Sequence, residues 1–267
     1  MERLLSDYNP KSITIFSRDE RKQYMMREEY PDSRIVFVIG DIRDYHSISQ
    51  VILNKDVVIN CAAMKHVPIS EHYPFEAVKT NVIGTENIIS AIQEHNTGVK
   101  VVVGVSTDKV VTPSGAYGMS KALSEKMFIN ANIRCPSTRF VIVRFGNIRG
   151  SSCSVIPLFQ RQIDNGGPVT ITDDRMTRYM IDKKKAADTI FDAIHLAAPG
   201  EIYIPDIPLI KISDLADEMI AGRPIKKVVV GARPGENIEE LLVSPNEKQI
   251  VVRKNGYFVI PFHMGGL

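Results

Sequence analysis

The sequence predicts an α/β protein, built on a doubly wound parallel sheet with a smaller α/β lobe. Short β-rich runs alternate with longer helical patterns over roughly the first half of the chain, which is typical of a parallel sheet with crossover helices. From Gly146 onward the pattern changes, since Gly and Pro become frequent and the apolar runs shorten. With 267 residues, 44% of them hydrophobic, the chain is long enough for one large domain and a smaller lobe.

The β-rich runs and the helical patterns follow one another in a regular order. The strands are expected at residues 12–16, 35–38, 57–60, 99–105 and 140–143. The helices are expected at residues 18–29, 45–53, 75–95 and 117–132, with another at 183–196. Residues 1–145 therefore form a Rossmann-like domain, to which the helix near 183–197 returns, and residues 146–267 form mainly a substrate-binding lobe.

Composition narrows the class of protein and its compartment. The 33 basic and 31 acidic side chains give a net charge of +2, without the concentrated basic face of a nucleic-acid-binding protein. Cys61, Cys135 and Cys153 are too few and too scattered for a disulfide framework or a zinc site, so no metal is expected. The chain has no apolar run of membrane-spanning length and no signal peptide. A cytoplasmic protein without membrane contact is expected.

The most reactive side chains stand between residues 105 and 121. A strand ends in Thr107, Asp108 and Lys109, and a helical pattern then begins with Tyr117 and Lys121. Residues four apart are neighbours on one face of a helix. A nearby ammonium favours a phenolate, so this pair predicts a general base made from tyrosine.

Residues after the first expected strand suit the adenosine end of a dinucleotide. Ser17 and Arg18 stand where an arginine can meet the 2′-phosphate of NADP, and Lys22 lies one helical turn further on. The same residues also suit an ordinary solvated helix start, with the acidic residues 19–20 at its N-terminus. The sequence leaves both interpretations open.

Two further strand ends suit the same cofactor. Asp41 and Ile42 would meet an adenine edge and face, although Gly-Asp is also common in turns. Ala62 and Ala63 are small enough to let a flat cofactor approach the backbone, and Lys65 would reach a ribose or phosphate.

Arginines of the second half suggest a diphosphate ligand. Arg175, Arg178 and Arg233 carry guanidinium groups, which bind phosphate oxygens through paired hydrogen bonds, and Glu236 follows closely. Taken singly, they suit surface salt bridges equally well. Beside a nucleotide-binding fold, they favour a nucleotide-sugar substrate.

Several motifs in the same order resemble the extended short-chain dehydrogenase/reductases, and more narrowly the inverting UDP-N-acetylglucosamine 4,6-dehydratases. The matching stretches are Ser-Arg-Asp-Glu (17–20), Ala-Ala-Met-Lys-His-Val-Pro (62–68), Ser-Thr-Asp-Lys (106–109), Tyr-Gly-Met-Ser-Lys (117–121), Arg-Phe-Gly-Asn (144–147), Arg-Met-Thr-Arg (175–178) and Arg-Pro-Gly-Glu (233–236). The resemblance implies NADP as cofactor, a UDP-hexosamine as substrate, a role in surface polysaccharide or glycan synthesis, and a homo-oligomer.

The resemblance also implies roles for the matching residues. Tyr117, helped by Lys121 and Thr107, would deprotonate the C4 hydroxyl while NADP takes the C4 hydride. Lys109 would act as base at C5, and Asp108 as acid on the departing C6 hydroxyl. Both reach one sugar only if the chain turns after the strand. The substrate-binding residues implied are Lys65, Asn147, Arg178, Arg233 and Glu236.

The chain departs from the family pattern at its start. Family members begin with a strand and a Gly-x-x-Gly-x-x-Gly turn that holds the cofactor pyrophosphate. Here Met1 is expected inside the following helix, with the first strand and the turn missing and two strand edges left exposed. Two alternatives therefore stay open: a catalytically silent homologue that binds a nucleotide-sugar or a partner, and a UDP-sugar 4-epimerase. Asp108 and Lys109 argue against the epimerase, because C4 redox chemistry needs neither.

Overall fold

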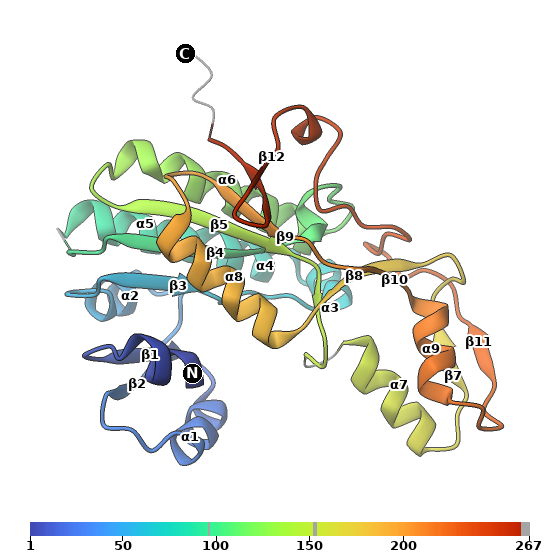
Figure 1. Cartoon of the computed structure of the whole chain (residues 1–267). Coiled ribbons are helices and arrows are strands. Elements are labelled where there is room, and N and C mark those ends of the chain that lie inside the picture. Colours follow the sequence, from blue (N-terminus) through green and yellow to red (C-terminus); the bar gives the residue numbers. More distant parts are fainter. Residues whose placement is uncertain (96, 152–153, 263–267) are drawn as a thin grey trace.

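A six-stranded sheet forms the centre of the molecule. The computed structural model describes residues 1–95, 97–151 and 154–262, so Cys153 lies outside the described residues (Figure 1). The sheet order is β12-β13-β9-β5-β4-β3. Its parallel strands are β3 (Val57–Asn60), β4 (Val101–Thr107), β5 (Arg139–Phe145) and β9 (Ile202–Pro205), and the antiparallel strands β13 (Tyr257–Ile260) and β12 (Val252–Lys254) extend one edge.

Helices cover both faces of this sheet, which explains why its central strands read as continuous apolar runs. Neighbouring residues of β4 enter different cores. Val102 packs in the core shared with α5 (Gly84–Glu94) and α6 (Ala116–Arg134), and Val103 in the core shared with α8 (Lys183–Leu196). On the α6 side Gly104 lets Phe128 approach, because a Cβ there would lie 2.7 Å from the Phe128 ring.

A separate two-stranded sheet lies beside β3. It contains β1 (Ile13–Ser17) and β2 (Ile35–Ile39), which are parallel and are joined through α1 (Glu20–Glu29) (Figure 1). Within the described residues, β1 pairs only with β2, and β3 pairs only with β4. Two strand edges are therefore left without a partner there, as the sequence predicted.

The segment between β2 and β4 is mostly helical. The single helix predicted at residues 75–95 is a continuous helical run of α4 (Pro74–Ala77), a π-helical turn (Val78–Ile83) and α5, preceded by α3 (Val67–His72). α2 (Tyr45–Val51) packs on α5 through isoleucines of the main core. The first turn of the chain, Leu4–Tyr8, packs on α8, where Tyr8 stacks on Phe191 at 4.5 Å between ring centroids. No helix in the described ranges is long and apolar enough to cross a membrane.

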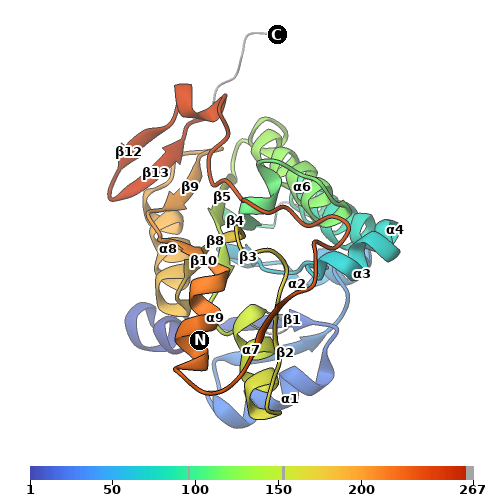
Figure 2. The ribbon, with the colours of Figure 1, turned by 90° about the vertical axis from the view of Figure 1, so that its right-hand side faces the viewer.

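The second lobe has its own small core. One three-stranded sheet contains β6 (Asn147–Ile148), β8 (Thr177–Ile181) and β10 (Leu209–Lys211), and β7 (Val169–Ile171) pairs with β11 (Lys227–Val229). α7 (Val155–Asp164) and α9 (Ile212–Ile220) lie side by side against this second pair (Figure 2). The division predicted at residue 145 is thus too simple, because β9, β12 and β13 complete the main sheet rather than the lobe.

A buried ion network ties the C-terminal segment to the central strands. The Arg144 side chain on β5 is 2% exposed and contacts the carboxylates of Glu125 and Glu247. Ser106 donates a hydrogen bond to Glu125 at 2.6 Å. The network thereby connects α6, the turn η4 (Glu247–Gln249) and the end of β4, one residue before the reactive stretch begins.

Candidate active site

The reactive stretch begins where β4 ends and the chain turns at once. Asp108–Val110 form a 3-10 turn (η3), and Thr107 Oγ1 accepts a hydrogen bond from the Lys109 amide at 3.5 Å. An extended chain would point Asp108 and Lys109 to opposite faces. The turn required for both to reach one substrate is therefore present.

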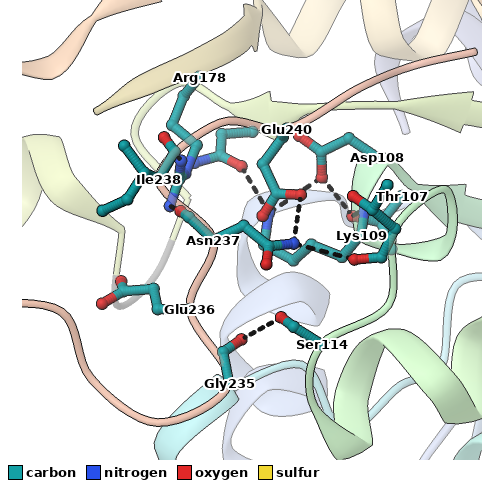
Figure 3. A network of polar contacts seen from close by, with 12 residues as sticks. Thr107, Asp108, Lys109, Ser114, Arg178, Gly235, Glu236, Asn237, Ile238 and Glu240 are labelled. Carbon is teal, nitrogen blue, oxygen red and sulfur yellow. Dashed lines mark hydrogen bonds and ion pairs between the residues drawn. The ribbon is translucent and has the colours of Figure 1, made fainter. Parts of the chain in front are cut away.

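Asp108 and Lys109 form the centre of a polar network (Figure 3). Asp108 is fully buried, and its Oδ1 accepts from Thr107 Oγ1 and from Lys109 Nζ, each at 2.9 Å. Lys109 Nζ also lies 3.4 Å from Asn147 Oδ1 and 3.6 Å from Glu240 Oε1. The other oxygen of Asp108, Oδ2, is buried without a hydrogen-bond partner in the described residues.

Tyr117 stands in the first turn of α6, whose start is fixed by Glu71. The Ala116 amide donates to Glu71 Oε1 at 2.5 Å. Burial raises the pKa of Tyr117, and the charge of Asp108 raises it further. A hydrogen bond with Thr107 lowers the pKa but does not cancel these effects. In this structure the side chain is therefore a phenol that needs a further interaction before it can act as a base.

Lys121 is buried on the next turn of α6. Its Nζ donates to the Val105 carbonyl at 2.7 Å. Burial lowers the pKa of Lys121 to about 8, although Glu125 and Cys61 oppose the change. The sequence argument paired this ammonium with the Tyr117 phenolate. Here the ammonium is engaged with a backbone carbonyl, a partner that no residue spacing could indicate.

The residues expected at the adenosine end lie on two neighbouring strand ends. Arg18 Nη1 lies 3.4 Å from Asp41 Oδ2, and the Arg18 side chain is 60% exposed. Lys22 instead pairs with Asp19 at 3.0 Å, as expected of a solvated helix start. Sequence reasoning missed Arg43, which also binds Asp41. Burial alone would raise the pKa of Asp41, but hydrogen bonds from Arg43 hold this pKa below its usual range.

Of the other residues predicted to bind the cofactor, one lies in the main core and the rest lie in the loop after β3. Ile42 is only 8% exposed and packs in the main core, so it does not offer a free face to adenine. Ala62 and Lys65 are exposed in the loop after β3, and Ala63 is half-buried. Asn81 holds this loop by a pair of hydrogen bonds with the backbone of Met64 (2.9 and 3.2 Å).

Two groups of the predicted residues lie where the two ends of a dinucleotide would bind. Ser17, Arg18 and Asp41 stand at the carboxyl ends of β1 and β2, where an adenosine ribose binds in doubly wound sheets. Tyr117 and Lys121 stand beside the reactive end of β4. Among the described residues before β1 there is no glycine, and Gly40 is the first glycine in the sequence.

The predicted diphosphate ligands are engaged within the protein. The Arg178 guanidinium is buried and donates to the carbonyls of Thr177 (2.7 Å), Asn237 (2.8 Å) and Ile238 (3.0 Å). Arg233 forms a paired contact with Glu236. Arg178 therefore fastens the strap, which we define as residues 233–240, to β8.

The strap lies across the reactive residues (Figure 3). Asn237 Nδ2 donates to the Thr112 carbonyl at 2.9 Å. A cavity of about 10 Å³, room for a single water, lies beside Lys109 and Tyr117 and is bounded by Gly235 and Asn237 of the strap. Sequence reasoning missed Asn237 and Glu240, since an amide and a carboxylate after a Pro-Gly turn carry no signal of their own.

Comparisons with known proteins bear on both the family and the fold. The family model described as polysaccharide biosynthesis protein matches residues 1–261. A UDP-N-acetylglucosamine 4,6-dehydratase (inverting) from Campylobacter jejuni is 38% identical over 260 residues, which are 96% of this chain and 77% of that protein. A UDP-glucose 4-epimerase from Rickettsia prowazekii is 41% identical over 255 residues, covering 94% of this chain and 74% of that protein.

Solved structures share the architecture. Pen from Bacillus thuringiensis matches with a TM-score of 0.91 at 37% identity, over 97% of this chain and 81% of that chain. DesIV from Streptomyces venezuelae, a dTDP-glucose 4,6-dehydratase with NAD bound, matches with a TM-score of 0.81 at 22% identity, over 93% and 85% of the two chains. The predicted α/β fold with its parallel sheet is thereby confirmed.

Proposed function

Because this chain belongs to the polysaccharide biosynthesis protein family of nucleotide-sugar dehydratases and epimerases, we propose that it catalyses 4,6-dehydration of UDP-N-acetylglucosamine or a related UDP-hexosamine, with inversion at C5. One observation carries this proposal. Asp108 and Lys109 follow the same strand as Thr107, and the immediate turn brings an acid and an amine to 2.9 Å from each other beside Tyr117. A carboxyl and an amine in contact suit an elimination, which needs an acid and a base on neighbouring carbons.

The residues divide the reaction into oxidation, elimination and reduction. The chemistry supplied by a bound nicotinamide cofactor is acceptance of the C4 hydride and its return to C6. Tyr117 takes the proton of the C4 hydroxyl, aided by Thr107. Lys109 then removes the C5 proton, which the new 4-ketone acidifies, and Asp108 protonates the C6 hydroxyl so that it leaves as water. Return of a proton to C5 on the opposite face inverts that centre.

Two features of the site support the elimination step. The Lys109 amine is held on three sides, by Asp108, Asn147 and Glu240, so its direction is fixed before substrate arrives. Asp108 has one buried oxygen without a partner, which is free to carry the proton that the C6 hydroxyl requires. Such fixed geometry is worth several powers of ten in rate.

We infer NADP as the preferred cofactor from Arg18. Its guanidinium is mostly exposed at the end of β1 and would meet a 2′-phosphate, although Asp41 lies 3.4 Å away and would repel one. Arg18→Ala should therefore weaken NADP binding more than NAD binding in a titration followed by fluorescence. Equal weakening of both would contradict the preference.

The function is tested by incubating the chain with UDP-N-acetylglucosamine and NADP and following the sugar by mass spectrometry and NMR. A 4-keto product lighter by one water supports the dehydratase. A C4 epimer of unchanged mass would instead support the epimerase, the activity named for the Rickettsia relative. Binding of the sugar without turnover would support the catalytically silent homologue.

A further inference from the structure

We propose that Glu240 is a positioning residue of the elimination step, which completes a carboxylate–amine–carboxylate cluster with Asp108 and Lys109. The inference rests on the dehydratase proposed above and adds to it a residue from the opposite end of the chain. The contact is made by the strap, so the second lobe takes part in shaping the base (Figure 3).

The geometry of Glu240 is that of a built site. Its side chain is 2% exposed, and its Oε1 lies 3.6 Å from Lys109 Nζ. Its Oε2 accepts from Asn237 Nδ2 at 3.3 Å, and that same amide nitrogen donates to the Thr112 carbonyl. Asp108 therefore holds the amine from one side and Glu240 from another. The strap that carries Glu240 is fastened in turn by Arg178.

The cluster has one carboxylate more than it has amines. If Asp108, Glu240 and Lys109 are all ionised, a buried group carries a net negative charge, which the low dielectric disfavours. An additional proton on one of the two carboxyls removes this excess and makes that carboxyl a carboxylic acid. This carboxylic acid is what the elimination needs at the C6 hydroxyl. Lys109 becomes the free amine needed at C5 when its ammonium proton passes to the remaining carboxylate, and Glu240 Oε1, 3.6 Å from Lys109 Nζ, is placed to take it.

The ionisation of Glu240 agrees with this arrangement. The charged groups that act on it are Lys109 and Asp108 from η3 and Arg178 from β8, with the Asn237 amide from the strap. Burial raises the pKa of Glu240 and Asp108 adds to it, while Lys109, Arg178 and Asn237 oppose it. A carboxyl whose folded-state pKa is raised destabilises the fold as pH rises through the interval between its unfolded and folded values. Ionisation of Glu240 is therefore expected to lower the stability of the fold.

The direction in which stability changes with pH distinguishes this proposal from a structural ion pair, in which ionised Glu240 would stabilise the fold. The measurement needs no cofactor. Thermal unfolding of the wild-type chain, Glu240→Gln and the control Glu239→Gln is followed between about pH 4 and pH 8, on either side of an ordinary glutamate pKa. Glu239 is the exposed neighbour of Glu240. We expect Glu240→Gln to unfold at a higher temperature than the wild type near pH 8, and this difference in unfolding temperature to disappear towards pH 4. A deficit near pH 8, or no change with pH, would overturn the proposal.

Activity then separates positioning from a general loss of structure. Glu240→Gln should lower kcat for dehydration about 10- to 100-fold, the range found when residues that orient metal ligands are replaced, with KM for the UDP-sugar within about twofold. Cofactor reduction in a single turnover should persist, because Tyr117 rather than Lys109 serves C4, and Glu239→Gln should match the wild type. If Glu240→Gln slowed cofactor reduction as much as dehydration, a positioning role in the elimination step would be contradicted. A wild-type chain that forms no product would contradict the dehydratase itself, whatever the unfolding curves show.

Discussion

At the scale of single residues, the chemistry of this protein depends on which groups are held away from water. Lys109 and Asp108 contact each other directly, whereas Lys121 is buried and bound to the Val105 carbonyl. The two lysines thus stand in different surroundings within 13 positions of each other. Lys109 is the one whose amine faces the acid, and Lys121 is the one that burial makes easier to deprotonate.

Replacing Lys109 should stop elimination without stopping oxidation. Lys109→Met is expected to lower the dehydration rate about 100- to 10,000-fold, the range for loss of a general base. Cofactor reduction in a single turnover should continue. The matched control is Lys100→Met, since the Lys100 side chain is 75% exposed and forms an exposed ion pair with Asp56. Dehydration by Lys109→Met at the wild-type rate would show that another group acts as the base at C5.

The buried Lys121 predicts a dependence of stability on pH. Its folded-state pKa is about 8, below the ordinary lysine value of 10.5, so the folded chain binds fewer protons than the unfolded chain between these values. Stability should therefore rise with pH from about 8 towards 10.5. Below that window the buried ammonium costs on the order of 3 kcal/mol, and the hydrogen bond to Val105 offsets about 1 kcal/mol.

Lys121→Met removes both contributions. The variant should unfold at a higher temperature than the wild type near pH 7, and the difference should shrink as pH rises through the window given above. Denaturant unfolding at several pH values measures this. A variant that is less stable near pH 7, by an amount independent of pH, would show that the ammonium is not penalised by burial.

At the scale of elements, the site depends on the close approach of α6 to η3. Gly118 permits this approach, because a Cβ there would lie 2.5 Å from the Lys109 carbonyl oxygen. The glycine thus sets the spacing between the helix that carries Tyr117 and the turn that carries Lys109. A shift of about 1 Å in such a spacing is enough to cost a large factor in rate.

Gly118→Ala should therefore impair catalysis more than folding. We expect turnover to fall at least about 100-fold, with destabilisation of about 1–3 kcal/mol from overpacking. Met119→Ala, in the same turn but exposed, is the matched control. If both variants turn over at the wild-type rate, the approach of α6 to η3 does not set the geometry of the site.

The elements that the sequence predicted are those whose signal is local. The run before Thr107 is apolar at every position but Gly104 from Val101 to Val105, so β4 was predictable, and the reactive side chains directly follow it. The roles of Arg178 and Glu240 were not predictable, because each depends on a partner about 60 or 130 positions away. Which carbonyl takes up a guanidinium is decided by packing and not by spacing.

At the scale of the whole molecule, the parallel strands of the N-terminal half belong to two sheets instead of one. β1 and β3 each keep one edge without a strand partner in the described residues. An apolar side chain accompanies one of these edges, since Val57 on β3 is 38% exposed. Open edges of this kind are templates for pairing with another chain.

We therefore predict that the chain self-associates through these edges as its concentration rises. Light scattering after size-exclusion chromatography should show a mass that increases with concentration. Val57→Lys places a charge on the β3 edge and should reduce that association. The control Leu209→Lys, at an exposed position of the second lobe, should leave the association unchanged. A constant monomer mass over the whole range would show that the chain does not self-associate, whereas equal effects of the two substitutions would place the association elsewhere. In that case the homo-oligomer that the family resemblance implies would have to be formed by another surface.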